Sequence, residues 1–81
     1  LMRFDKGDIV VCVKLDDSGH LELNQRYQIY ESIEMSEQHV IQIVKLENYH
    51  SGKGLGFYST DNFIPINEWR QKKINEILNN G

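Results

Sequence analysis

The stretch Ile9-Val10-Val11-Cys12-Val13-Lys14-Leu15 is the most β-prone run of the chain. β-Branched side chains fit the pleated surface of a sheet, so residues 9–15 predict a first strand. Side chains alternate between the two faces of a strand, which separates Val11 from Val10 and Cys12. Both faces are apolar, as is typical of a central or strongly curled strand. Cys12 is therefore interpreted as a small core residue rather than a nucleophile.

Four more strands are predicted downstream, each bounded by turn-forming residues. They cover residues 26–34, 39–46, 55–59 and 63–66. Residues 60–62 favour one turn of 3₁₀ helix, and Pro65 places the last strand at a sheet edge because proline cannot donate to a ladder. Alternation predicts that the core includes Tyr27, Ile29, Ile33, Phe57 and Phe63. The same alternation leaves the inner and outer faces of residues 39–46 open.

A C-terminal amphipathic helix is predicted over residues 67–79, with Asn67 as its N-cap. Residues three and four apart share a helix face. One face accordingly carries Trp69, Lys73, Ile74, Ile77 and Leu78. We expect this helix to pack across the strands with Trp69 buried against them. The alternative is that Trp69 marks a partner surface or a self-association face.

Length and composition predict one small domain. The chain has 81 residues, 40% of them hydrophobic, and a formal charge of −3. A chain of this size has little apolar surface to spare for anything except one core, so residues 1–81 are expected to form a single domain. The lone Cys12 cannot form an internal disulfide, and no apolar run reaches the length of a membrane span, so a cytoplasmic protein without membrane partners is expected. Its acidic balance disfavours nucleic acid as a partner.

Three segments resemble a group of small bacteriophage-encoded SH3-like barrel proteins. They are Phe4-x-Lys6-Gly7-Asp8-Ile9-Val10-Val11-Cys12-Val13, Leu23-x-x-x-Tyr27-x-Ile29 and Tyr58-x-x-x-Asn62-Phe63-Ile64-Pro65. The predicted order of strands, loops and 3₁₀ turn is also that of SH3-like barrels. Where the group has Gly before the second-strand Tyr, this chain has Asn24, which also tolerates the left-handed conformation.

The resemblance implies a mainly β fold, a small five-stranded SH3-like barrel over residues 4–66 with a C-terminal α-helix beyond it. It also implies a phage protein working in the bacterial host cytoplasm. Recognition of Pro-rich peptides is not implied, because the chain lacks the Ala-Leu-Tyr-Asp-Tyr motif of eukaryotic signalling domains, and its one Trp lies in the predicted helix.

No catalytic or metal-binding motif is predicted. The three His residues and Cys12 lack the short spacing of metal sites, so no metal and no cofactor are expected. Residues 51–56 contain Gly and Lys but lack the Ser or Thr and the following helix of a phosphate-binding loop. Asp16 and Asp17 are adjacent in a polar loop and point apart. The chain is therefore expected not to be an enzyme.

The favoured prediction is a non-enzymatic protein-binding module that engages a host or phage protein. Carboxylates in the long first loop could meet a basic partner, and tyrosines near loops could supply apolar area with a hydroxyl group. The predicted contact residues are Asp16, Asp17, Glu22, Tyr30, Tyr49 and Tyr58.

Two alternatives stay open. A small barrel could bind single-stranded nucleic acid through a local basic patch despite its negative total charge. The candidate residues are Lys53, Arg70, Lys72 and Lys73. A solvated helix face with ion pairs explains the same charges. The chain could instead be a structural subunit that forms a homo-oligomer through its C-terminal helix.

Overall fold

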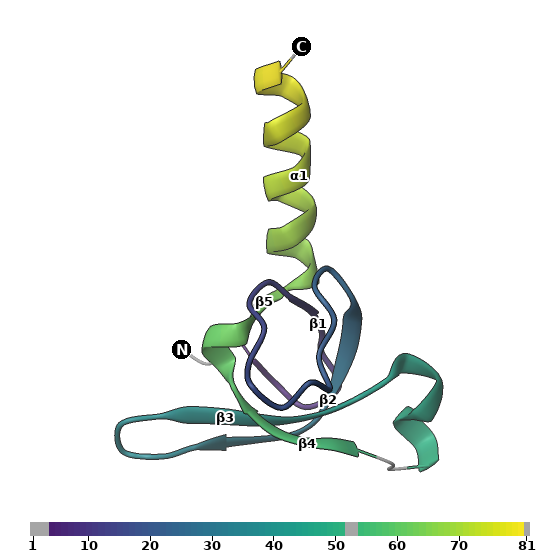
Figure 1. The fold of residues 1–81 in the computed structure, drawn as a ribbon, viewed down its shortest axis with the longest axis vertical. Coiled ribbons are helices and arrows are strands. Elements are labelled where there is room, and N and C mark those ends of the chain that lie inside the picture. Colours follow the sequence, from purple (N-terminus) through teal and green to yellow (C-terminus); the bar gives the residue numbers. More distant parts are fainter. Residues whose placement is uncertain (1–3, 52–53, 81) are drawn as a thin grey trace.

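A computed structural model describes residues 4–51 and 54–80, which form one antiparallel sheet and a projecting helix (Figure 1). The elements are β1 (Ile9–Cys12), β2 (Arg26–Glu34), β3 (His39–Val44), the 3₁₀ helix η1 (Leu46–Ser51), β4 (Gly54–Ser59), the 3₁₀ helix η2 (Thr60–Asn62), β5 (Phe63–Pro65) and α1 (Ile66–Asn80). The strand order is β4-β3-β2-β1-β5, an open sheet with β4 and β5 at its edges. The prediction of a mainly β fold with five strands and a C-terminal helix is confirmed at this level.

Strand β1 is shorter than the predicted range 9–15, because the backbone beyond Cys12 forms hydrogen bonds with Asn62 of η2 instead of with a neighbouring strand. The backbone N–H groups of Val13 and Lys14 both donate to the carbonyl of Asn62, at 2.8 and 3.3 Å. The side-chain amide of Asn62 donates in turn to the carbonyl of Lys14 at 2.9 Å. Asn62 is buried, so these bonds satisfy its polar groups and tie the end of β1 to the turn before β5.

The core lies on one face of the sheet, which we call the inner face. Its members are Phe4, Val10, Cys12, Leu21, Tyr27, Ile29, Ile41, Ile43, Tyr58 and Phe63. The rings of Tyr27 and Phe63 meet edge to face with centroids 6.2 Å apart, which joins β2 to β5. The predicted burial of Tyr27, Ile29, Phe63 and Cys12 is confirmed.

A β-bulge at Tyr30 overturns the predicted face of Ile33. Ile29 pairs with Ile43, but the next aligned residues are Glu31 and Gln42, so Tyr30 is an additional residue on β2. This insertion moves every later residue of β2 to the opposite face. Ile33 therefore lies on the outer face, with 42% of its surface exposed.

The faces of Phe57 and Tyr58 on β4 are the reverse of the prediction. Tyr58 pairs with the buried Ile41 and is only 7% exposed, whereas its neighbour Phe57 pairs with Gln42 and is 52% exposed. Alternation requires that one of two adjacent aromatic residues face outward, but it does not say which one. The register with β3 decides in favour of Tyr58.

Helix α1 does not pack across the sheet, contrary to the expectation. It projects along the long axis of the molecule (Figure 1), and its main contacts are with β1 and β5. Residues 70–78 are all exposed, while Trp69 is half-buried at the helix base. The helix starts at Ile66, immediately after Pro65, and without an intervening loop the chain does not turn back over the sheet.

Asn24 provides a test of the turn that precedes β2. Its φ is 66°, in the left-handed region, and its N–H donates to the carbonyl of Cys12 at 2.8 Å. Asn24→Ala is expected to lower the free energy of unfolding by about 1 kcal/mol, because a Cβ-bearing residue without a local polar group resists this conformation. Asn24→Gly, the control, is expected to change it by less than about 0.5 kcal/mol. Urea unfolding followed by fluorescence measures both, and equal effects would contradict the prediction.

The projecting helix provides a second test. Ile77 is 71% exposed, so Ile77→Gln is expected to change the free energy of unfolding by less than about 0.5 kcal/mol. Ile41 is fully buried, so Ile41→Ala is expected to lower it by about 2–5 kcal/mol. If Ile77→Gln proved as destabilising as Ile41→Ala in urea, the helix would have to pack against the core.

Candidate functional site

The predicted partner-binding residues fall into two groups in the structure. Tyr30 and Tyr49 lie together beside the β2 bulge, with ring centroids 6.0 Å apart. Asp16, Asp17 and Glu22 lie in the loop that follows β1. The hydroxyl group of Tyr58 lies within hydrogen-bond distance of this loop. We call residues Lys6, Tyr30, Glu31, Tyr49 and His50 the tyrosine surface, and residues 16–22 the acidic loop.

The tyrosine surface is built from three segments that are distant in the sequence. The bulge directs Tyr30 outward from β2, and η1 contributes Tyr49 and His50, whose rings meet edge to face at 5.6 Å. Lys6 Nζ lies 5.8 Å from the centroid of the Tyr30 ring and 3.3 Å from Glu31 Oε1. Both tyrosines are half-buried, so each presents part of its ring to solvent while neighbouring groups hold it.

Hydrogen bonds fix the turn that brings Lys6 to this surface. The N–H of Gly7 donates to the carbonyl of Ile29 at 2.7 Å, and Gln28 Nε2 donates to the carbonyl of Gly7 at 2.9 Å. Gly7 has a φ of 93°, which glycine adopts without strain. The Lys6-Gly7 turn is therefore anchored to β2 one residue before the bulge.

The 3₁₀ helix η1 fixes the position of Tyr49. The N–H of Asn48 donates to the carbonyl of Lys45 at 2.8 Å, and Ser51 Oγ donates to the carbonyl of Asn48 at 2.9 Å. Residues 48–51 have no apolar period, so the sequence does not indicate that His50 and Tyr49 form part of one surface. Lys6 and Glu31 were also missed, because neither has a sequence signal beyond its charge.

The carboxylates of the acidic loop are not equivalent. Asp16 Oδ1 accepts hydrogen bonds from the N–H of Ser18 at 3.1 Å and from Ser18 Oγ at 2.7 Å. Asp16 therefore stabilises its own turn. Asp17 and Glu22 are exposed. They are the members of the predicted set whose carboxylates are most available to a partner.

Tyr58 does not present its ring outward, contrary to the prediction. Its ring is buried and meets Phe63 edge to face at 6.4 Å. Its hydroxyl oxygen lies 3.3 Å from His20 Nδ1 and 3.4 Å from Ser18 Oγ. Tyr58 thus connects the core to the acidic loop and acts as a support for the loop rather than as a contact residue.

The cations proposed for nucleic-acid binding do not gather on one side of α1. Arg70 and Lys72 are separated by about 160° around the helix, given about 100° per residue. Lys73 Nζ lies 3.5 Å from Glu76 Oε2 and 5.6 Å from the centroid of the Trp69 ring. Lys53 falls outside the described residues. Binding of single-stranded nucleic acid stays a prediction, without a structural observation in its favour.

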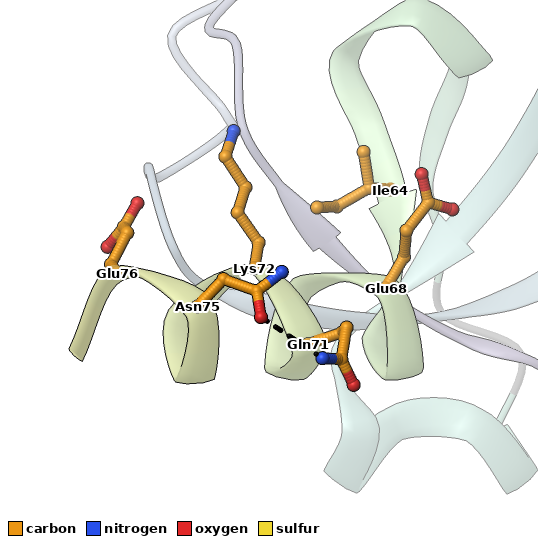
Figure 2. Close-up of a pocket in the computed structure, with 6 residues that line it drawn as sticks. All are labelled: Ile64, Glu68, Gln71, Lys72, Asn75 and Glu76. Atoms are coloured by element: carbon orange, nitrogen blue, oxygen red, sulfur yellow. Dashed lines mark hydrogen bonds between the residues drawn. The ribbon is translucent and has the colours of Figure 1, made fainter. Parts of the chain in front are cut away.

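Two shallow grooves run beside α1. The larger has a volume of about 450 Å³ (Figure 2) and is lined by Ile64, Glu68, Gln71, Lys72, Asn75 and Glu76. Gln71 Nε2 donates to Asn75 Oδ1 at 3.3 Å along its rim. The smaller groove, of about 200 Å³, places Trp69 beside Val13 and Leu23. Trp69 therefore lies between the helix and the loops of the sheet.

Within residues 4–51 and 54–80, no group of three or more His, Cys, Asp and Glu side chains is placed to hold a metal ion. His39 instead bonds to Ser32, with Nε2 2.6 Å from Ser32 Oγ. No helix in the described part of the chain is long and apolar enough to cross a bilayer.

Comparisons with known proteins give no family assignment. No protein-family model matches the chain, and neither a curated protein nor a solved structure matches it significantly. The interpretation therefore depends on the residues and their geometry.

Two buried groups that ionise at high pH, the Cys12 thiol and the Tyr27 hydroxyl, predict how the free energy of unfolding depends on pH. Burial raises the pKa of the Cys12 thiol above its ordinary value of 9.0. Burial also raises the pKa of the Tyr27 hydroxyl above its ordinary value of 10.0, although the N–H of Glu22 donates to this oxygen and opposes the shift. Folding favours the neutral form of both groups. Their contribution to the free energy of unfolding is therefore complete below pH 9, and it is lost as the pH rises through the folded-state pKa values.

We expect the free energy of unfolding to decline as the pH rises above about 9. Urea titrations across this range measure it, and Cys12→Ala is expected to make the decline shallower because one of the two groups is removed. A steeper decline in the variant would contradict the assignment to Cys12.

Proposed function

We propose that the chain is a non-enzymatic protein-binding module with an SH3-like barrel fold, encoded by a bacteriophage and acting on a host or phage protein in the bacterial cytoplasm. The tyrosine surface is its principal contact, and the acidic loop guides a basic partner toward it. The observation that carries this proposal is the pair of half-exposed tyrosines held in place beside the β2 bulge.

The arrangement of elements supports the SH3-like part of the proposal. A long loop follows β1, a short one joins β2 to β3, and a 3₁₀ turn separates β4 from the short β5. This is the order expected for such barrels, with η1 in place of a plain loop. β1 pairs with both β2 and β5, which lets the sheet curl around one core.

The properties of the tyrosine surface favour a protein partner. Tyr side chains offer a large apolar area and a hydroxyl group with few rotatable bonds, so binding costs them little conformational entropy. Here the edge contact with Tyr49 and the nearby Lys6 restrict Tyr30 before any partner arrives. The Lys6–Glu31 pair at the border can exchange its partners for charges on the other protein.

The acidic loop contributes mainly to the rate of encounter. Asp17 and Glu22 are exposed, where charge acts over a distance and is screened by salt. Exposed charges of this kind change the association rate more than the dissociation rate. The two groups of predicted residues therefore have different roles in the proposed binding.

Substitution of Tyr49 tests the principal contact. Immobilised protein captures bound chains from a bacterial lysate, and the affinity of the captured chain is then measured with purified components. Tyr49→Ala is expected to weaken binding about tenfold or more, chiefly through faster dissociation. The matched control is Leu15→Ala, which removes an exposed apolar side chain elsewhere and is expected to leave binding unchanged.

Charge reversal separates the two roles. Asp17→Lys together with Glu22→Lys is expected to slow association and to reduce its salt dependence, with little change in the dissociation rate. If Tyr49→Ala bound as tightly as the unmodified chain, the tyrosine surface would not be the contact. If no chain were captured above the level of a blank matrix, the protein-binding proposal itself would fail.

A further inference from the structure

Helix α1 carries an apolar stripe that nothing within the described chain covers. Ile74, Ile77 and Leu78 are 50%, 71% and 72% exposed. Three adjacent large aliphatic side chains on one face are more than scattered exposed residues require. Arg70 lies on the same face, four residues before Ile74 and seven before Ile77. We call these four residues the helix stripe.

The helix stripe is basic. Glu68 and Glu76 lie on the other side of α1, where they line the larger groove (Figure 2). Lys73 borders the stripe, and its charge is shared with Glu76 at 3.5 Å. Arg70 is therefore the charge that a surface covering the stripe must accommodate. Such a surface has to combine apolar area with carboxylates.

A surface with this character exists elsewhere on the same chain. On the outer face of the sheet, Ile33 of β2 pairs with Val40 of β3, and Phe57 of β4 pairs with Gln42, two residues further along β3. Ile33 and Phe57 are 42% and 52% exposed. We call Ile33, Val40 and Phe57, with Glu31 and Glu37, the hairpin face.

The hairpin face is acidic. Glu31 lies on the outer face of β2, where Lys6 Nζ lies 3.3 Å from its Oε1, and Glu37 is exposed in the turn between β2 and β3. Glu34 is exposed on the opposite face of the same hairpin, where it pairs with His39. Residues 31–40 contain these three acids and neither Lys nor Arg. With Lys6 included, three acids against one base leave this hairpin negative, which is opposite in sign to the helix stripe, and both surfaces have an apolar centre.

One copy of the chain cannot join its own two surfaces. Figure 1 shows α1 at one end of the long axis and strands β3 and β4 at the other, in a molecule 41 Å long. Pairing of two helix stripes does not satisfy Arg70 either. In a parallel pair of helices the two Arg70 side chains lie opposite each other. In an antiparallel pair centred on Ile74, Arg70 of one helix lies opposite Leu78 of the other. Neither arrangement supplies a carboxylate.

We propose that a second copy of this chain covers the helix stripe, which docks on the hairpin face of the next molecule. The contact is head to tail, so a pair of copies keeps one free helix stripe and one free hairpin face. Such a heterologous interface generates an open filament or a closed ring. Because a patch of a few side chains buries less area than a permanent interface, assembly is expected to depend on concentration.

The experiment uses the full chain and two single substitutions at exposed positions. Ile77→Gln disables the helix stripe, and Phe57→Thr disables the hairpin face while keeping a side chain suited to a strand. Light scattering and sedimentation velocity follow molar mass against concentration, and circular dichroism with urea unfolding confirms that both variants are folded. The unmodified chain is expected to grow beyond a dimer, and each variant alone is expected to associate at least about tenfold more weakly.

Mixing the two variants provides the decisive measurement. A Phe57→Thr copy retains a helix stripe and an Ile77→Gln copy retains a hairpin face, so an equimolar mixture is expected to form dimers and nothing larger. A monomer at every concentration of the unmodified chain would overturn the proposal. Association of Phe57→Thr equal to that of the unmodified chain would also overturn it, because the helix would then pair with another helix. A monomeric mixture would do the same.

Discussion

The bulge at Tyr30 is the constraint on which the rest of the sheet depends. One additional residue in β2, between the pairs Ile29–Ile43 and Glu31–Gln42, reverses the faces of the strand beyond it. Before the bulge, β2 fills the core with Tyr27 and Ile29. Beyond it, Ile33 faces solvent. The same insertion directs Tyr30 outward, beside Tyr49, so the irregularity that disrupts the core pattern also forms the tyrosine surface.

A second constraint acts at the junction of β5 and α1. Pro65 ends the edge strand and Ile66 begins the helix, so no loop separates them. The helix leaves the sheet at its edge, and only its base contacts β1 and β5 (Figure 1). Without this junction the stripe of Ile74, Ile77 and Leu78 would have access to the sheet. With it, those side chains lie in solvent unless another molecule covers them.

The sequence predicts the local features of this fold well. The strand of residues 26–34, the 3₁₀ turn of residues 60–62 and the left-handed Asn24 depend on neighbours in the chain, and each is found where expected. The faces of Ile33 and Phe57 are not local, because a bulge and the pairing register with β3 decide them. The helix was predicted correctly, but its direction depends on a junction that periodicity does not describe.

Alternation places Ile33 and Phe57 in the core, but the structure places both on the outer face, at the centre of the hairpin face. A polar side chain is sufficient at a solvent-facing position of a strand or helix. Phe57, Ile33 and Ile77 lie at such positions and do not contribute to the core. Their apolar character is informative because they satisfy the pattern of a buried element without being buried. In a chain of 81 residues with one small core, such side chains need a covering surface. The opposite charges around the two patches make a second copy of the chain the partner that fits both.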